Sequence, residues 1–75
     1  MKKTYTTIIA HADNTTTIYT DEGHNLTFNQ LVRFVKDSMH NDHTITSAIV
    51  SNGRKSVEMV QTFNAITCMH EIRKL

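Results

Sequence analysis

The stretch Leu26-Thr27-Phe28-Asn29-Gln30-Leu31 decides the fold, because it specifies the start of a helix in two independent ways. Thr27 can cap the first free amides, and Gln30, three residues on, can bond back to the amide of Thr27 as a capping box requires. Leu26 before the cap can pack against Leu31, the fourth helical residue, as a hydrophobic staple. A helix that begins at Phe28 is therefore predicted, and the rest of the chain is interpreted around it.

The segment after this start has the periodicity of an amphipathic helix. Its apolar residues fall at offsets that place side chains on one helical face, namely Phe28, Leu31, Val32, Val35 and Met39. Arg33, Lys36 and Asp37 point away from that face. Asn41 is expected to end the helix in a left-handed conformation.

A β-hairpin is predicted before the helix. Residues 4–12 and 15–20 are rich in threonine and isoleucine, and Asp13-Asn14 between them suits a tight two-residue turn. This turn would set Ile9 opposite Ile18 and Ile8 opposite Tyr19, so that apolar residues meet on both faces.

A second hairpin is predicted after the helix. Residues 44–51 and 55–61 flank Asn52-Gly53, the strongest short turn signal in the chain. A bulged three-residue loop would pair Ile49 with Val57 and Ser47 with Met59. This register is preferred over a two-residue loop, which would set Ile49 opposite Ser56.

Residues 62–75 fit either a helix or a strand. A helix would align Ala65, Cys68, Met69 and Ile72, whereas a strand would place Ile66, Cys68 and Ile72 on one face. The lack of a turn residue after the fourth strand favours the helix. The expected fold class is α+β: a four-stranded, mostly antiparallel sheet from two β-hairpins, with the capped helix packed on one face (ββαββ) and a second, C-terminal helix.

The composition indicates one small folded domain over residues 1–75. The chain is 39% hydrophobic with a net charge of only +1, which argues against intrinsic disorder and against a strong field for nucleic acid or anionic lipid. Cys68 is the only cysteine, so no internal disulfide can form and a reducing compartment, the cytoplasm, is expected. No stretch approaches the length of a membrane span, and no membrane association is expected.

His40 and His43 are the candidate metal ligands. Together with Asp42 they place two imidazoles and a carboxylate within four residues. The alternative is a solvated helix end at which a cationic imidazole is favoured by the dipole, and this interpretation is preferred. No cofactor is expected.

Catalysis is not expected. Cys68 and His70 could suggest a thiol nucleophile, but residues two apart on a helix point in different directions. The chain contains no glycine-rich phosphate loop, no metalloprotease motif and no serine-hydrolase motif. No small-molecule substrate is evident.

Binding of nucleic acid is the alternative function. Tyr5 and Tyr19 could stack bases if both lie on an open sheet face, and the basic pairs Lys2-Lys3 and Arg54-Lys55 could contact phosphates. Tyrosine on a strand is, however, more often a packing residue.

Binding of a protein partner, or self-association, is the favoured function. A chain this short cannot cover both faces and both edges of its sheet, and an uncovered face or edge can accept another protein or a second copy. Its size and its lack of cofactor motifs are those of small phage or mobile-element accessory and inhibitor proteins, an analogy of general character only.

Overall fold

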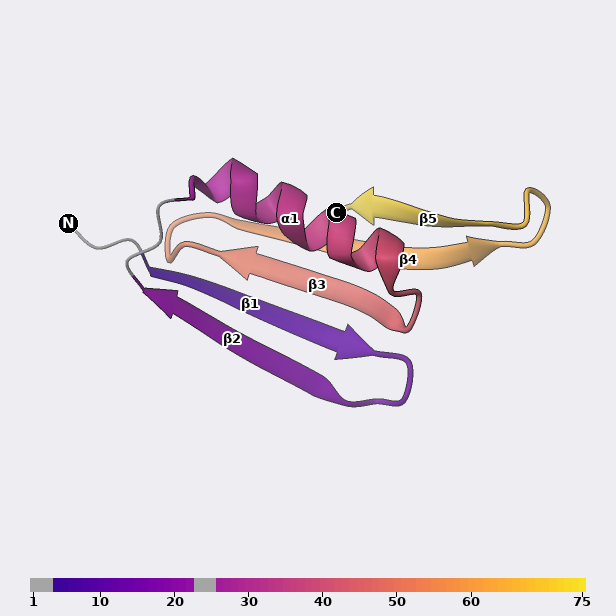
Figure 1. Cartoon of the computed structure of the whole chain (residues 1–75), viewed down its shortest axis with the longest axis horizontal. Coiled ribbons are helices and arrows are strands. Elements are labelled where there is room, and N and C mark those ends of the chain that lie inside the picture. The colour runs from indigo at the N-terminus through magenta and orange to yellow at the C-terminus, as the bar shows by residue number, and fades with distance from the viewer. Residues whose placement is uncertain (1–3, 23–25) are drawn as a thin grey trace.

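The computed structural model describes residues 4–22 and 26–75 of the chain. The elements are β1 (Thr4–His11), β2 (Thr16–Glu22), α1 (Phe28–Asn41), β3 (Ile45–Ser51), β4 (Ser56–Asn64) and β5 (Met69–Lys74). The strands form one antiparallel sheet in the order β2-β1-β3-β4-β5, and α1 lies across one face of it (Figure 1). In the part of the chain that the structure describes, no helix is long and apolar enough to cross a membrane.

The α+β class is confirmed, but the expected count of four strands and the second helix are wrong. Residues 62–75 contain the end of β4, a turn and the fifth strand. The turn is made by Asn64, whose Oδ1 accepts the amides of Ile66 at 2.9 Å and Thr67 at 3.4 Å. A side chain thus supplies the reversal that glycine or proline usually signals.

The capped helix is confirmed at its start. The amide of Gln30 donates to Thr27 Oγ1 at 3.2 Å, and the amide of Thr27 donates to Gln30 Oε1 at 2.9 Å. At its other end α1 stops at Asn41, as expected, but not through a left-handed residue. Asp42 follows in an extended conformation, with φ −136° and ψ 96°, and a turn over His43 and Thr44 then leads to β3, the amide of Ile45 donating to the carbonyl of Asp42 at 3.2 Å.

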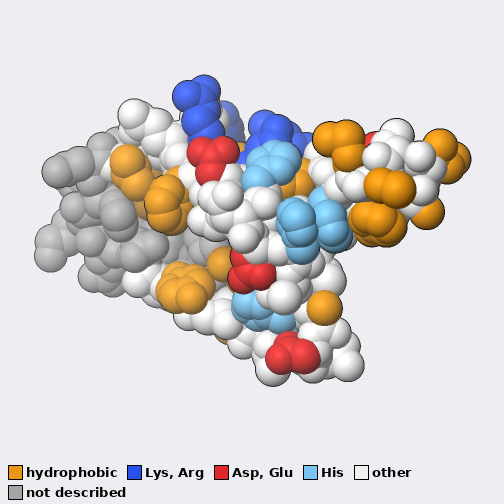
Figure 2. Space-filling view, turned by 45° about the vertical axis from the view of Figure 1, so that its right-hand side comes forward, with side chains coloured by type: hydrophobic (Ala, Val, Ile, Leu, Met, Phe, Trp, Pro, Cys, Tyr) orange, Lys and Arg blue, Asp and Glu red, His pale blue; other side chains and the backbone are white. Residues whose placement is uncertain are grey.

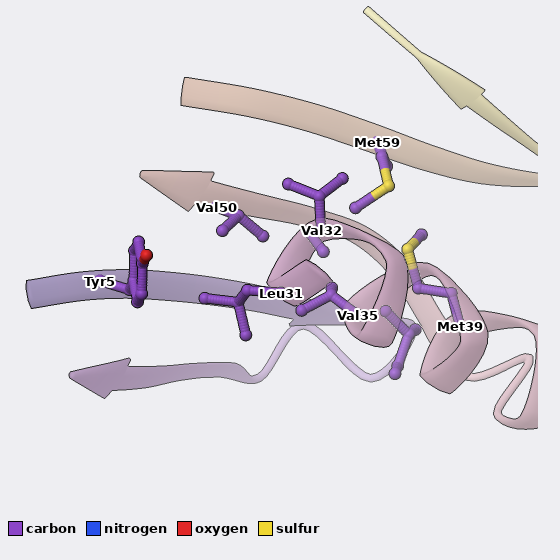
Figure 3. Packing of buried hydrophobic residues seen from close by; sticks show 9 residues of the cluster. Tyr5, Leu31, Val32, Val35, Met39, Val50 and Met59 are labelled. Atoms are coloured by element: carbon purple, nitrogen blue, oxygen red, sulfur yellow. The ribbon is translucent and has the colours of Figure 1, made fainter. Parts of the chain in front are cut away.

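The core lies between α1 and the sheet. Leu31, Val32, Val35 and Met39 point from the helix toward Tyr5, Val50 and Met59 on the strands (Figure 3). Met39, Val50 and Met59 are the largest side chains that are fully buried. The helical stripe predicted from the sequence is therefore the face that packs.

The first hairpin forms in a different register from the one expected. Ile8, not Ile9, lies opposite Ile18, and Ile9 lies opposite Thr17. The reason is a three-residue loop: the amide of His11 bonds to the carbonyl of Thr15 at 2.9 Å, and Asn14 takes a left-handed conformation with φ 69°.

The second hairpin is also shifted. Val50 lies opposite Val57, and Ala48 lies opposite Met59. The last ladder pair is Ser51 with Ser56; beyond it the amide of Asn52 bonds to the carbonyl of Lys55 at 3.0 Å, and Gly53 takes a left-handed conformation with φ 89°. The expected bulged loop that pairs Ile49 with Val57 is therefore not formed.

Candidate protein-binding surface

The two C-terminal strands project from the body of the sheet as an arm. The ladder between β3 and β4 ends at the pair of Ser47 and Val60. From Gln61 to Asn64, β4 pairs with β5 alone, so residues 61–72 form a two-stranded hairpin, here called the β4–β5 arm. Figure 1 shows this arm reaching beyond α1 and the other strands, and the molecule measures 47 Å along its long axis against 22 and 19 Å along the others.

The tip of the arm, residues 63–69, exposes large apolar side chains. Phe63 is 58% exposed, Ile66 94% and Met69 63%. Figure 2 shows hydrophobic side chains gathered at this projecting end. Single exposed apolar residues are normal on a protein surface, whereas a group of them on one protruding element is a feature common to interaction sites.

The turn at the tip is held in one shape. Besides accepting the amides of Ile66 and Thr67, Asn64 donates from Nδ2 to Glu71 Oε1 at 3.2 Å. Cys68 closes the turn in the left-handed region, with φ 55°, where residues other than glycine are uncommon. The apolar tip is therefore a preformed structure with Ile66 at its apex.

Gln61 anchors the base of the arm at the point where β4 leaves the body of the sheet. Its side chain is only 8% exposed, and Nε2 donates to the carbonyls of Ile45 at 2.8 Å and Asp42 at 3.3 Å. These carbonyls lie at the junction between α1 and β3. The buried Oε1 has no hydrogen-bond partner among the described residues. The amide thus ties the arm to the helix end through its donor side alone.

A column of aromatic rings supports the arm from the same side. His43, just after α1, stacks on His70 of β5 with ring centroids 3.7 Å apart and an interplanar angle of 20°. His70 in turn lies opposite Phe63, at 5.1 Å between centroids. Two-stranded hairpins are marginal alone in water, so packing of this kind is needed to keep the arm folded.

The two tyrosines proposed as base-stacking residues lie on the sheet face that α1 covers. Tyr5 is buried, and its hydroxyl donates to the carbonyl of Leu26 at 2.9 Å. Tyr19 faces the same side and is 52% exposed. The open face carries neither ring, and Tyr5 has no exposed surface on which a base could stack.

Of the predicted basic residues, Arg54 and Lys55 do not line a basic groove that sequence reasoning missed. Lys2 and Lys3 lie outside the described residues, and Arg54 and Lys55 are exposed in the turn between β3 and β4. The groove, of about 600 Å³, lies between α1 and β5, and its basic side chains, Arg33, Lys36, His40 and Lys74, lie beside one carboxylate, that of Asp37. Figure 2 shows Lys and Arg side chains gathered along one edge of the molecule. The sequence signal that could have predicted this groove is the spacing of Arg33, Lys36 and His40, which places the three side chains along one face of the helix.

The two histidines predicted as metal ligands have different surroundings. His40 lines the basic groove, whereas His43 stacks on His70. Residues 4–22 and 26–75 contain no group of three or more His, Cys, Asp or Glu side chains placed to hold a metal ion.

Two aspartates have turn-forming roles. Asp42 Oδ1 accepts the hydroxyl of Thr44 at 2.6 Å and its amide at 3.0 Å. Asp13 binds Thr15 in the same way. In each case the hydrogen bond from the threonine hydroxyl, helped by the backbone amide, lowers the pKa of the carboxyl. Both carboxylates are therefore committed to holding loops in place.

No protein-family model, curated protein or solved structure is significantly similar to this chain.

Proposed function

We propose that this chain is a non-enzymatic binding module that docks the tip of its β4–β5 arm onto a protein partner. The observation that carries the proposal is the exposure of Phe63, Ile66 and Met69 together on a projecting, preformed turn. The lone cysteine favours the cytoplasm as the place where this binding occurs.

The chemistry of the tip favours a protein over a nucleic acid. Residues 61–69 contain no lysine, arginine, aspartate or glutamate, so the tip offers no charge to a phosphate backbone. Aromatic and methionine side chains are enriched at protein interfaces, where they fill desolvated pockets. Ile66 at the apex, flanked by Phe63 and Met69, has the shape of a small apolar plug for such a pocket.

The anchors at the base of the arm favour binding without a large loss of conformational freedom. Gln61 fixes β4 to the helix end, and the stacked rings of His43 and His70 fix β5. An interface that is ordered before binding loses less entropy on association and so retains more of its contact energy.

The test compares proteins captured from a host-cell lysate by the immobilised chain and by two variants. Ile66→Asp places a charge at the apex, whereas Ser56→Asp places the same charge at the opposite end of β4 and is the matched control. We expect one protein to be captured equally by the native chain and by Ser56→Asp. The amount captured by Ile66→Asp should be at least tenfold lower, as for substitution of a central interface residue. The purified partner should then show the same order of affinities in solution. Identical capture by all three proteins would contradict docking through the tip.

A second candidate function, binding of nucleic acid, is supported by the basic groove. Arg33, Lys36, His40 and Lys74 could contact successive phosphates along the side of α1. Fluorescence anisotropy with labelled single- and double-stranded DNA and RNA at low and moderate salt tests it. Phosphate contacts predict steep salt dependence and weaker binding by an Arg33→Ala, Lys36→Ala double variant. Absence of binding at low salt would remove this candidate.

A further inference from the structure

In the part of the chain that the structure describes, no strand pairs with the outer edge of β2, so backbone hydrogen-bonding groups along this edge have no ladder partner. In an antiparallel ladder, every second pair of opposite residues is hydrogen-bonded. Because His11 bonds to Thr15, the bonded pairs between β1 and β2 include Ile9 with Thr17 and Thr7 with Tyr19. Thr17 and Tyr19 therefore direct their amides and carbonyls toward β1. Those of Thr16, Ile18 and Thr20 point outward, away from the sheet.

This edge lacks the features that keep sheet edges from pairing. The strand has no proline and no glycine, its ladder with β1 runs without a bulge, and its two charged residues, Asp21 and Glu22, stand together at its end, so that Thr16 to Thr20 carry no charge. The opposite edge strand, β5, carries Glu71, Arg73 and Lys74 within six residues. Charged side chains, proline and bulges are the usual protection of an edge, so β5 is protected, whereas β2 is open from Thr16 to Thr20.

Apolar side chains flank the open edge on both faces of the sheet. Ile18 is 64% exposed on the face without a helix, and Tyr19 lies on the other face. Beside Tyr19, a largely apolar groove of about 340 Å³ runs between the sheet and α1, with Phe34 exposed on its helical wall. It stays open because α1 lies over β3, β4 and β5. None of residues 4–22 and 26–75 covers the surface formed by this edge and its two flanks.

We propose that β2 pairs antiparallel with β2 of a second copy of this chain, about a two-fold axis at Ile18. The two sheets would then join into one continuous sheet with both helices on the same face. The proposal does not depend on the β4–β5 arm, which lies at the other edge of the sheet and remains free in such a dimer.

The sequence of β2 fits a copy of itself in this register. Ile18 lies opposite Ile18 of the second copy, and Thr16 lies opposite Thr20, so the outward amides and carbonyls all meet partners. On the helix side, Thr17 lies opposite Tyr19 of the second copy. Each cross-strand pair is thus β-branched or aromatic, which is the composition that stabilises paired strands, and no like charges are opposed from Thr16 to Thr20. The two apolar grooves would face each other across the seam.

Sedimentation equilibrium over a wide range of concentrations tests the proposal with the full chain. The native protein should reach twice its chain mass of 8.6 kDa. Ile18→Pro removes an outward amide and no bond to β1, and should raise the dimer dissociation constant about tenfold or more. Lys74→Pro, which removes an outward amide from the β5 edge, is the matched control and should leave the dimer unchanged. A monomer at every concentration, a dimer that is indifferent to Ile18→Pro, or one equally sensitive to Lys74→Pro overturns the proposal.

A cysteine cross-link decides the register if the proline variant does not fold. In a Cys68→Ser background, Ile18→Cys would face Ile18→Cys of the second copy across a bonded pair, within the Cα separation that a disulfide spans. Oxidation should give a covalent dimer, whereas Ile49→Cys, in the middle of the same open face, should not. A dimer in which Ile18→Cys does not cross-link, or in which Ile49→Cys cross-links equally well, overturns the proposed pairing.

Discussion

Substitution of Gln61 should separate hydrogen bonding from packing at the base of the arm. Its amide nitrogen donates to the carbonyls of Ile45 and Asp42, and no donor in the described structure reaches its Oε1. Gln61→Met preserves most of the volume and removes the donor. Gln61→Glu preserves the shape but turns a carboxylate oxygen toward two carbonyl oxygens.

The two substitutions differ in magnitude. Gln61→Met loses one good and one long hydrogen bond but also removes the unpartnered Oε1, so we expect a loss of about 1–3 kcal/mol in the free energy of unfolding. Gln61→Glu loses the same bonds and leaves a buried charge without a partner, which costs about 3–5 kcal/mol at neutral pH. The position is 8% exposed, so little solvent is present to screen that charge.

The pH dependence of the Gln61→Glu variant provides the decisive comparison. Burial beside carbonyl oxygens raises the pKa of the introduced carboxyl in the folded state above its value of about 4.3 in the unfolded chain. The folded state therefore binds more protons, and the deficit relative to the native protein grows as the pH rises above about 4. Urea unfolding of the native chain, Gln61→Met and Gln61→Glu at pH 4 and pH 7.5 measures the stability deficit of each variant. Gln61→Met should show nearly the same deficit at both pH values. If Gln61→Glu is as stable as the native chain at pH 7.5, the amide does not make the two bonds that anchor the arm.

The remaining predictions concern the helix, its loops and the core. Thr27→Ala should lower the free energy of unfolding by about 1 kcal/mol through loss of the cap, and Thr27→Ser should restore most of it. Leu31→Ala should cost about 2–5 kcal/mol in urea unfolding, since Leu31 is buried; a loss below half a kcal/mol would mean that this face of α1 does not pack. Tyr5→Phe should cost about 1 kcal/mol by leaving the Leu26 carbonyl without its donor, and an unchanged melting temperature would argue against that bond. For Asp42 the lowered pKa means that the ionised carboxylate stabilises the fold above about pH 4 and loses this effect as the pH falls through the lowered value. Asp42→Asn should therefore destabilise the protein most at neutral pH, and a deficit that persists unchanged in acid would contradict the role of the charge.

The helix could be predicted because its signals are local. The capping box of Thr27 and Gln30 and the stripe from Phe28 to Met39 act within a few turns of one another, and packing on the sheet reinforces them. Strand registers were harder, since a loop one residue longer shifts every pair. In the first hairpin the left-handed residue is Asn14, so the loop spans three residues and Ile8 replaces Ile9 opposite Ile18.

The arm was missed because its turn has no glycine or proline. Asn64 and Cys68 form the reversal through a side-chain acceptor and a left-handed backbone, so the apolar spacing of residues 65–72 was interpreted as a helical face. That interpretation placed Met69 on the apolar face of a helix, whereas it is exposed at the tip of the arm. The contact between His43 and His70 joins residues far apart in the sequence, and no local pattern predicts it.

The strand order has a consequence for how fast the chain folds. The ladders of β1 with β2, β3 with β4 and β4 with β5 are all hairpins between consecutive strands, so their loop-closure entropy is small. Only the ladder between β1 and β3, which joins Thr6 to Ser51 and His11 to Ile45, spans the helix in sequence. Its closure sets the contact order of the protein and, on this account, the height of the folding barrier. Substitutions along β1 and β3 should therefore slow folding, whereas those in the arm should mainly accelerate unfolding, so the strands expected to form first are not those of the proposed binding surface.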